Sequence, residues 1–212
     1  MRFAFKVSLI CLVGLIILFL FSCQKNPTGP PGIKDLFPLA VGNYWVYEGK
    51  ICNWYCFDSE IREEISGYDT LSDGSSVFIK RKITFHSANL SDTIISYLKF
   101  EGNELREYLN KDYGCQFKIL LEVPLQIGAE WNIDACFCAA CPVEVAIADS
   151  VETVENIAVP AGSFNDCYRI VTCNCPDYTD TRWFAPSIGI TKLTVERIWG
   201  SATYVLKEYR VR

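Results

Sequence analysis

Apolar and polar residues alternate along most of the chain beyond residue 40. In Val77–Phe85 most apolar residues share one parity and two lysines and a threonine share the other; Phe117–Leu121 and Lys192–Glu196 repeat the pattern. Successive side chains of a strand point to opposite faces of a sheet, so a period of two predicts half-buried strands. No apolar stripe with the 3.6-residue period of a helix accompanies these runs. The pattern therefore predicts an all-β protein.

Short polar segments rich in Gly, Asp and Asn separate the runs. Ser72–Ser75 and Asn110–Gly114 are two of them. Glu101-Gly102-Asn103 lies between the apolar runs Ile94–Phe100 and Leu105–Leu109. Gly and Asn adopt the backbone angles that tight turns require, so this segment predicts a β-hairpin.

A further turn is expected at Pro160-Ala161-Gly162, where Pro presets φ and Gly eases the exit. It would join a strand ending at Val159 to one that contains Tyr168 and Ile170. Roughly nine to eleven strands joined mostly by short turns predict a large antiparallel meander. A sheet of that size must curl or fold over to cover its apolar face, so we expect a curved sheet, half-barrel or sandwich.

Composition narrows the class of protein. The chain has 212 residues, which is room for one ordinary domain, and half of them are hydrophobic. Its formal net charge of −5 offers no basic surface to a nucleic acid. The single His excludes metal sites built from several imidazoles. Trp45, Trp183 and Phe184 are expected to be core anchors rather than platforms for a stacked ligand.

The first 22 residues have the pattern of a secretory signal. Arg2 and Lys6 are their only charged residues, and Leu9–Phe21 is an almost unbroken apolar run. Thirteen apolar residues fit a signal peptide and fall short of the ~20 that a membrane span needs. A short anchor that is never cleaved is the alternative.

The segment Leu20-Phe21-Ser22-Cys23 resembles the lipobox of bacterial lipoproteins, in which a small residue precedes the acylated Cys. The resemblance implies cleavage before Cys23, diacylglycerol on its sulfur, and an acyl chain such as palmitate on the new amino terminus. Several acyl chains anchor a protein firmly to a membrane. Gln24, where an Asp would signal retention, implies the outer membrane by the sorting rule of such lipoproteins.

The chain then divides into three parts. Residues 1–22 are the expected signal peptide, and their removal takes away two positive charges, from −5 to −7. Residues 23–32, rich in Pro and Gly, are expected to be a lipidated flexible tether. Residues 33–212 are the expected single all-β domain.

Cysteines outside the signal and the lipid site number nine, and exported chains meet oxidising conditions. We therefore expect structural disulfides, with Cys52 and Cys56 in a stapled loop. An odd number leaves at least one thiol unpaired. The nine candidates are Cys52, Cys56, Cys115, Cys136, Cys138, Cys141, Cys167, Cys173 and Cys175.

Two sharper interpretations of the cysteines stay open. Cys138–Cys141 has the CxxC spacing of dithiol oxidoreductases, but Pro142 and an alternating run follow it, where redox sites have a helix. A tetrahedral zinc site is the weaker alternative to disulfides. Its ligands would come from Cys136, Cys138, Cys141, Cys173 and Cys175.

Two segments resemble a group of secreted bacterial proteins of unknown function. The first is Leu36–Tyr47, with the pattern FPLxxGNxWxY. The second comprises Val159–Phe164, with the pattern VPAGxF, and Trp183–Lys192, which begins WFAPxxG. The resemblance implies an all-β fold and an envelope location. It implies no activity, cofactor or catalytic residue.

Candidate catalytic groups are few, and the chain contains no GxSxG, HExxH or phosphate-binding glycine loop. His86 could serve as a base, although a lone His at the end of a strand is more often a polar surface residue. Paired carboxylates for glycoside hydrolysis could come from Glu63 and Glu64 or from Asp149–Glu155. Calcium could bind near Asp177 and Asp180, without the EF-hand spacing.

The sequence therefore favours a membrane-anchored, disulfide-stapled lipoprotein that is not an enzyme and needs no cofactor. It would act at the outer membrane as a binding or envelope-interaction module, its partner an apolar ligand or an envelope protein. Two alternatives remain, a hydrolase or thiol oxidoreductase on the same sheet and a purely structural scaffold.

Overall fold

The computed structural model describes residues 32–86, 91–112, 117–133, 147–175 and 178–212. They belong to one compact unit, Pro31–Arg212. Within these ranges no helix has the length and apolar character to cross a membrane.

The elements are one short helix and twelve strands in the part of the chain described. They are α2 (Ile33–Leu36), β1 (Tyr44–Cys52), β2 (Cys56–Thr70), β3 (Ser76–His86), β4 (Ser91–Glu101), β5 (Glu104–Tyr108), β6 (Phe117–Glu122), β7 (Glu130–Ile133), β8 (Ile147–Val159), β9 (Gly162–Cys175), β10 (Tyr178–Ala185), β11 (Gly189–Arg197) and β12 (Gly200–Arg210).

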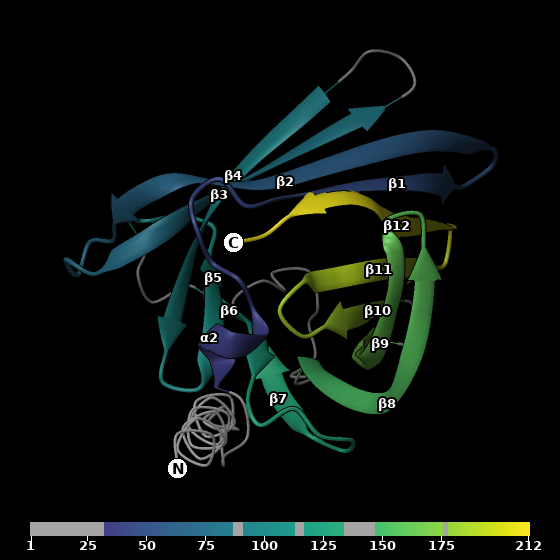
Figure 1. Cartoon of the computed structure of the whole chain (residues 1–212). Helices are drawn as coiled ribbons and strands as arrows, with labels where there is room; N and C mark the ends of the chain where they lie inside the picture. Colours follow the sequence, from purple (N-terminus) through teal and green to yellow (C-terminus); the bar gives the residue numbers. More distant parts are fainter. Residues whose placement is uncertain (1–31, 87–90, 113–116, 134–146, 176–177) are drawn as a thin grey trace, which may run out of the picture. The chain divides into compact units, whose positions relative to one another are not determined.

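All twelve strands form one antiparallel sheet in the order β6-β5-β4-β3-β2-β1-β12-β11-β10-β9-β8-β7. The edge strands β6 and β7 contact each other, so the sheet curls into a nearly closed barrel (Figure 1). The predicted all-β meander is confirmed. One strand more than predicted is present, because β7 is only four residues long and too short to show alternation.

Three of the predicted turns are where the sequence placed them, and the fourth, Asn110–Gly114, extends outside the described residues. Gly102, at φ 58°, turns β4 into β5, and Gly74, at φ 82°, turns β2 into β3. Pro160 and Ala161 connect β8 to β9. These glycines occupy the left-handed region that other residues rarely adopt.

Strand β3 faces the interior with its polar side. Lys80 pairs with the buried Ile65, and Thr84 pairs with the buried Ile61, so these residues share the inner face. Of the apolar residues of the other parity, Phe85 is 42% exposed, whereas Val77 is buried in a separate small cluster with Leu71 and Tyr108. Alternation therefore identified the strand correctly, but the interior accommodates the polar side of β3.

The segments that carry the family resemblance meet at one end of the barrel. Trp45 Nε1 donates a hydrogen bond to the carbonyl of Ile188, at 2.6 Å. Phe37 stacks on Phe184 with ring centroids 6.2 Å apart. Gly189 approaches the Trp45 ring so closely that a Cβ would lie 3.3 Å from Nε1. Trp45, Trp183 and Phe184 are buried as predicted. The two segments pack against each other.

Candidate functional site

A small cavity lies inside the curled sheet. Its volume is about 80 Å³, and most of its lining is apolar. Three charged side chains also reach it, namely Glu63, Lys80 and Arg182. Charged groups beside an apolar cavity are the usual composition of a small-molecule site.

The first set of charged side chains spans three neighbouring strands. Lys80 Nζ of β3 lies 2.5 Å from Glu107 Oε1 of β5, and Ser96 Oγ of β4 donates to the same oxygen at 2.7 Å. Burial alone would raise the pKa of Glu107, but the Lys80 charge and the two hydrogen bonds outweigh it and hold this pKa at about 2. Both partners are therefore charged at neutral pH.

The second charged group lies across β8, β9 and β10. Asp149 is fully buried and accepts hydrogen bonds from Arg182 Nη2 and Thr172 Oγ1. Arg182 is 8% exposed, and its Nε is buried with no hydrogen-bond partner among the described residues. An unpaired buried donor costs roughly 1–3 kcal/mol. Arg182 therefore retains one unused donor beside the cavity.

Lys118 of β6 adds a third cation close to these groups. It pairs in register with Glu107, on the face that carries the buried Leu105. Burial and the nearby Arg182 charge lower the pKa of Lys118, against weaker opposing effects of Asp149 and Glu107. Within the described residues no acid forms an ion pair with it. We call Lys80, Glu107, Lys118, Asp149 and Arg182 the interior charge cluster.

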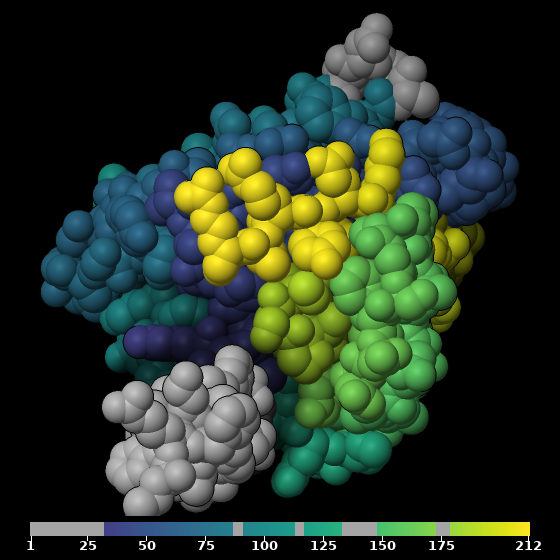
Figure 2. Space-filling view, in the orientation of Figure 1, coloured from purple at the N-terminus to yellow at the C-terminus, as the bar shows by residue number. Residues whose placement is uncertain are grey.

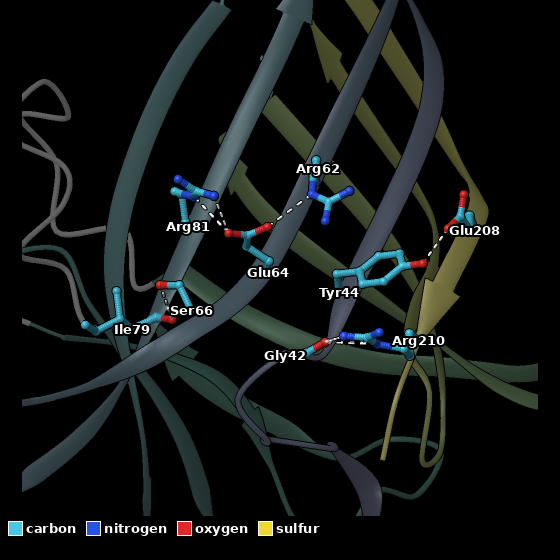
Figure 3. A network of polar contacts seen from close by, with 9 residues as sticks. All are labelled: Gly42, Tyr44, Arg62, Glu64, Ser66, Ile79, Arg81, Glu208 and Arg210. Atoms are coloured by element: carbon cyan, nitrogen blue, oxygen red, sulfur yellow. Dashed lines mark hydrogen bonds and ion pairs between the residues drawn. The ribbon is translucent and has the colours of Figure 1, made fainter.

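Glu63 and Glu64 do not form a carboxylate pair. They are adjacent in β2 and therefore point to opposite faces. Glu63 reaches the cavity, whereas Glu64 lies on the outer face between Arg62, at 3.1 Å, and Arg81, at 2.5 Å (Figure 3). Hydrolysis by this pair, one of the sequence hypotheses, is excluded by the strand geometry.

The outer face beside Glu64 is a continuous strip of polar contacts. Tyr44 donates to Glu208, and its ring lies 4.8 Å from the Arg62 guanidinium and 5.4 Å from that of Arg210 (Figure 3). Arg210 also donates to the Gly42 carbonyl. The groups of this strip satisfy one another, which indicates a structural role.

The acids of β8 are also engaged separately. Asp149 binds Arg182, Glu152 binds Arg169, and Glu155 accepts a hydrogen bond from Trp183 Nε1 at 2.6 Å. They therefore do not converge on one reaction centre.

The remaining polar candidates are His86, Asp177 and Asp180. His86 Nε2 lies 3.8 Å from Asp92, and its Nδ1 has no partner among the described residues. Asp180 pairs with Arg197 at 3.2 Å, and Asp177 lies outside the described residues. No group of three His, Cys, Asp or Glu in the described ranges is placed to hold a metal.

Two cysteines form the stapled loop that the sequence predicts. Cys52 and Cys56 are joined by a disulfide at the end of the β1–β2 hairpin. Cys167 is not a disulfide partner here: it is a free thiol, fully buried beside Trp183 and Ala185. The other candidates, and Cys23, lie outside the residues whose side chains are described: Cys115, Cys136, Cys138, Cys141, Cys173 and Cys175.

Sequence reasoning missed the interior charge cluster. Its five members lie on β3, β5, β6, β8 and β10, and each looks like an ordinary solvated residue of an alternating strand. No local signal identifies them, because only the pairing of strands brings them together.

No family model and no curated protein matches this chain. Two solved structures resemble it in fold. One is from Bacteroides fragilis and is provisionally described as an exported protein with a YmcC-like fold, with 11% identity, a TM-score of 0.49, and coverage of 82% of this chain and 98% of that one. The other, from Parabacteroides distasonis, is provisionally described as a lipoprotein, with 15% identity, a TM-score of 0.48, and coverage of 82% and 97%. At these values they identify neither a family nor a function for this chain.

Proposed function

We propose that this protein is a non-enzymatic lipoprotein of the bacterial outer membrane that binds a small carboxylic acid inside its barrel. The observation that carries the proposal is the buried, unpaired Nε of Arg182, a residue that lines an apolar cavity. A carboxylate is the acceptor that a guanidinium donor binds best.

The cationic environment supports the same ligand. Lys118 has no ion-pair partner within the described residues and lies close enough to Arg182 for their charges to repel. Lys118 does not itself line the cavity, so a carboxylate there would satisfy the free Nε of Arg182 and offset the repulsion of Lys118 through its charge alone. Lys80 and Asp149 are already engaged and would hold the walls in place.

The size of the cavity limits the ligand. An apolar cavity of roughly 150 Å³ holds benzene, so a cavity of about 80 Å³ takes a smaller molecule. A short-chain carboxylic acid fits both requirements, because its carboxylate would meet Arg182 and its alkyl part would meet residues such as Leu98 and Ile170.

Propionate and its neutral isostere propionamide test the proposal in an NMR titration of the protein. We expect propionate to bind and propionamide to bind much more weakly. Lys118→Gln should lower the propionate affinity, because it removes a positive charge close to Arg182. The matched control is Lys207→Gln, which removes an exposed lysine that pairs with Glu60 and should leave affinity unchanged. Equal binding of the two probes would contradict the proposal.

The membrane anchor is a separate part of the proposal and rests on the lipobox-like segment that ends at Cys23. In cells, Cys23→Ser should abolish acylation, measured by intact mass, and shift the protein from the membrane fraction. Cys11→Ser changes a cysteine inside the expected signal and should have no effect on either. Unchanged acylation of the Cys23 variant would remove the anchor from the proposal.

A further inference from the structure

Two hairpin ends expose large apolar side chains at neighbouring positions. Trp54 and Tyr55, at the β1–β2 end, are 90% and 75% exposed. Ile198 and Trp199, at the β11–β12 end, are 56% and 75% exposed. We call these four residues the aromatic tip. The other tryptophans, Trp45, Trp131 and Trp183, are all buried.

The two ends lie side by side because β1 pairs with β12. Cys52, at the end of β1, is opposite Ser201, at the start of β12. A Cβ on Gly200 would overlap the Asn53 side chain and lie 2.6 Å from the Cys52 carbonyl oxygen, so the two turns are in contact. The blue β1–β2 end and the yellow start of β12 are adjacent at the right of Figures 1 and 2.

The β1–β2 end is also held in shape. The disulfide between Cys52 and Cys56 closes it, and Asn53 N donates to the Tyr55 carbonyl at 3.1 Å. Fixed aromatic side chains lose little entropy when a partner covers them. The tip is therefore presented to the outside in a preorganised form.

The charges at the tip differ from those of the whole chain. The chain carries a net charge of −5, yet the segments 52–57 and 197–200 contain no acid, and Arg197 is their one charged residue. Acidic and basic residues, including Lys50, Asp58 and Glu60, begin directly behind the tip. The exposed apolar surface is thus a small patch surrounded by charged residues.

We propose that the aromatic tip inserts into the headgroup region of a phospholipid bilayer. Trp and Tyr prefer this region because it is apolar on one side and wet on the other. Ile198 adds aliphatic surface that suits acyl chains, and the lack of acids avoids repulsion by anionic lipids. This contact goes beyond the proposed function, since it is made by protein side chains without Cys23 and without the interior cavity.

A lipid surface suits the tip better than a protein or a glycan. A stable protein interface covers ~800 Å² on each partner, and four side chains surrounded by charges provide a small apolar core for it. A glycan platform needs polar groups around the rings to bind sugar hydroxyls, and between Cys52 and Cys56 only the Asn53 amide and the Tyr55 hydroxyl are uncharged polar groups apart from the Trp54 indole N–H.

Tryptophan fluorescence tests the proposal directly. The probe protein is the chain from residue 23 onward with Cys23→Ser, so that no acyl chain contributes, and the vesicles are phosphatidylcholine with phosphatidylglycerol. Because the other three tryptophans are buried, Trp54 and Trp199 should give the whole response. We expect a blue shift on mixing and quenching by brominated acyl chains.

The double variant Trp54→Ser, Trp199→Ser should lower the vesicle partition coefficient at least tenfold, measured by co-flotation. Its matched control is Ile127→Ser, which removes a 64% exposed apolar side chain outside the tip and should change nothing. Melting temperatures equal to that of the probe protein without these substitutions would establish that both variants are folded. Failure to co-float, or tip-dependent binding of peptidoglycan fragments or of a protein in place of vesicles, would overturn the proposal. Propionate binding by the tip variant would be unchanged, so the two proposals can fail independently.

Discussion

Lys80 and Glu107 form an ion pair in a place where strand alternation would put apolar residues. Their side chains are only 13% and 15% exposed, so each charge depends largely on the other for compensation. Ser96 Oγ donates a further hydrogen bond to the carboxylate of Glu107. At the residue scale, the interior of this barrel is therefore specified by polar matching as well as by apolar packing.

We expect Glu107→Gln to lower the free energy of unfolding by ~3–5 kcal/mol, the usual cost of leaving a buried charge without its partner. Urea unfolding measures the change. Glu101→Gln removes a half-exposed acid that pairs with Lys99 and should change stability far less, because water screens that pair. Similar effects of the two variants would show that Lys80 is not isolated from water.

Glu107→Gln also tests how the free energy of unfolding depends on pH. The pKa of Glu107 is about 2 in the fold, below the ordinary value of 4.5, so its contribution is complete above pH 4.5 and is lost as pH falls toward 2. The unfolding free energy of the unmodified protein should fall across that window. The fall should be shallower in Glu107→Gln, which has no carboxylate to protonate. Urea titrations at a series of pH values measure both slopes.

At the scale of elements, close approach of strands imposes requirements that alternation does not show. Gly49 of β1 faces Tyr204 of β12, and a Cβ there would overlap both the Tyr204 ring and the Thr203 carbonyl. Gly67 of β2 is different, because a Cβ would meet only Ile79 Cδ1, at 3.8 Å. Two glycines in neighbouring strands thus have different reasons for being there.

We expect Gly49→Ala to lower the free energy of unfolding by ~1–3 kcal/mol, because overpacking against backbone forces strands apart. Gly67→Ala should have an effect near zero or slightly stabilising, since Ala restricts the unfolded chain. Thermal and urea unfolding of both variants measure the difference. Equal stability of the two would mean that the β1–β12 pair relaxes without cost.

At the scale of the whole molecule, β12 joins the two halves of the sheet. It pairs with β1 on one side and β11 on the other, so the last strand of the chain holds the first six strands to the remaining ones. The contact between β6 and β7 then closes the barrel. The interior charge cluster and the aromatic tip each combine residues from both halves; the tip depends on the pairing of β1 with β12, and the cluster also brings β6 close to β8 and β10.

The sequence by itself determined the strands and their turns. Alternation at Phe117–Leu121 and the turn at Gly102 depend on residues within a few positions of one another. Such local preferences can be deduced from the sequence. It also indicated the burial of Trp45 and a stapled loop at Cys52 and Cys56, while the pairing of these two cysteines came from the structure.

Tertiary structure alone decided which face of each strand is inside and which charges meet. A period of two is the same for either face, so Lys80 on the inner side of β3 could not be deduced from β3 alone. Lys118 and Arg182 are 64 positions apart and come together only because the sheet closes. Long-range pairing sets burial, and burial sets whether a lysine is a solvated surface group or part of a site.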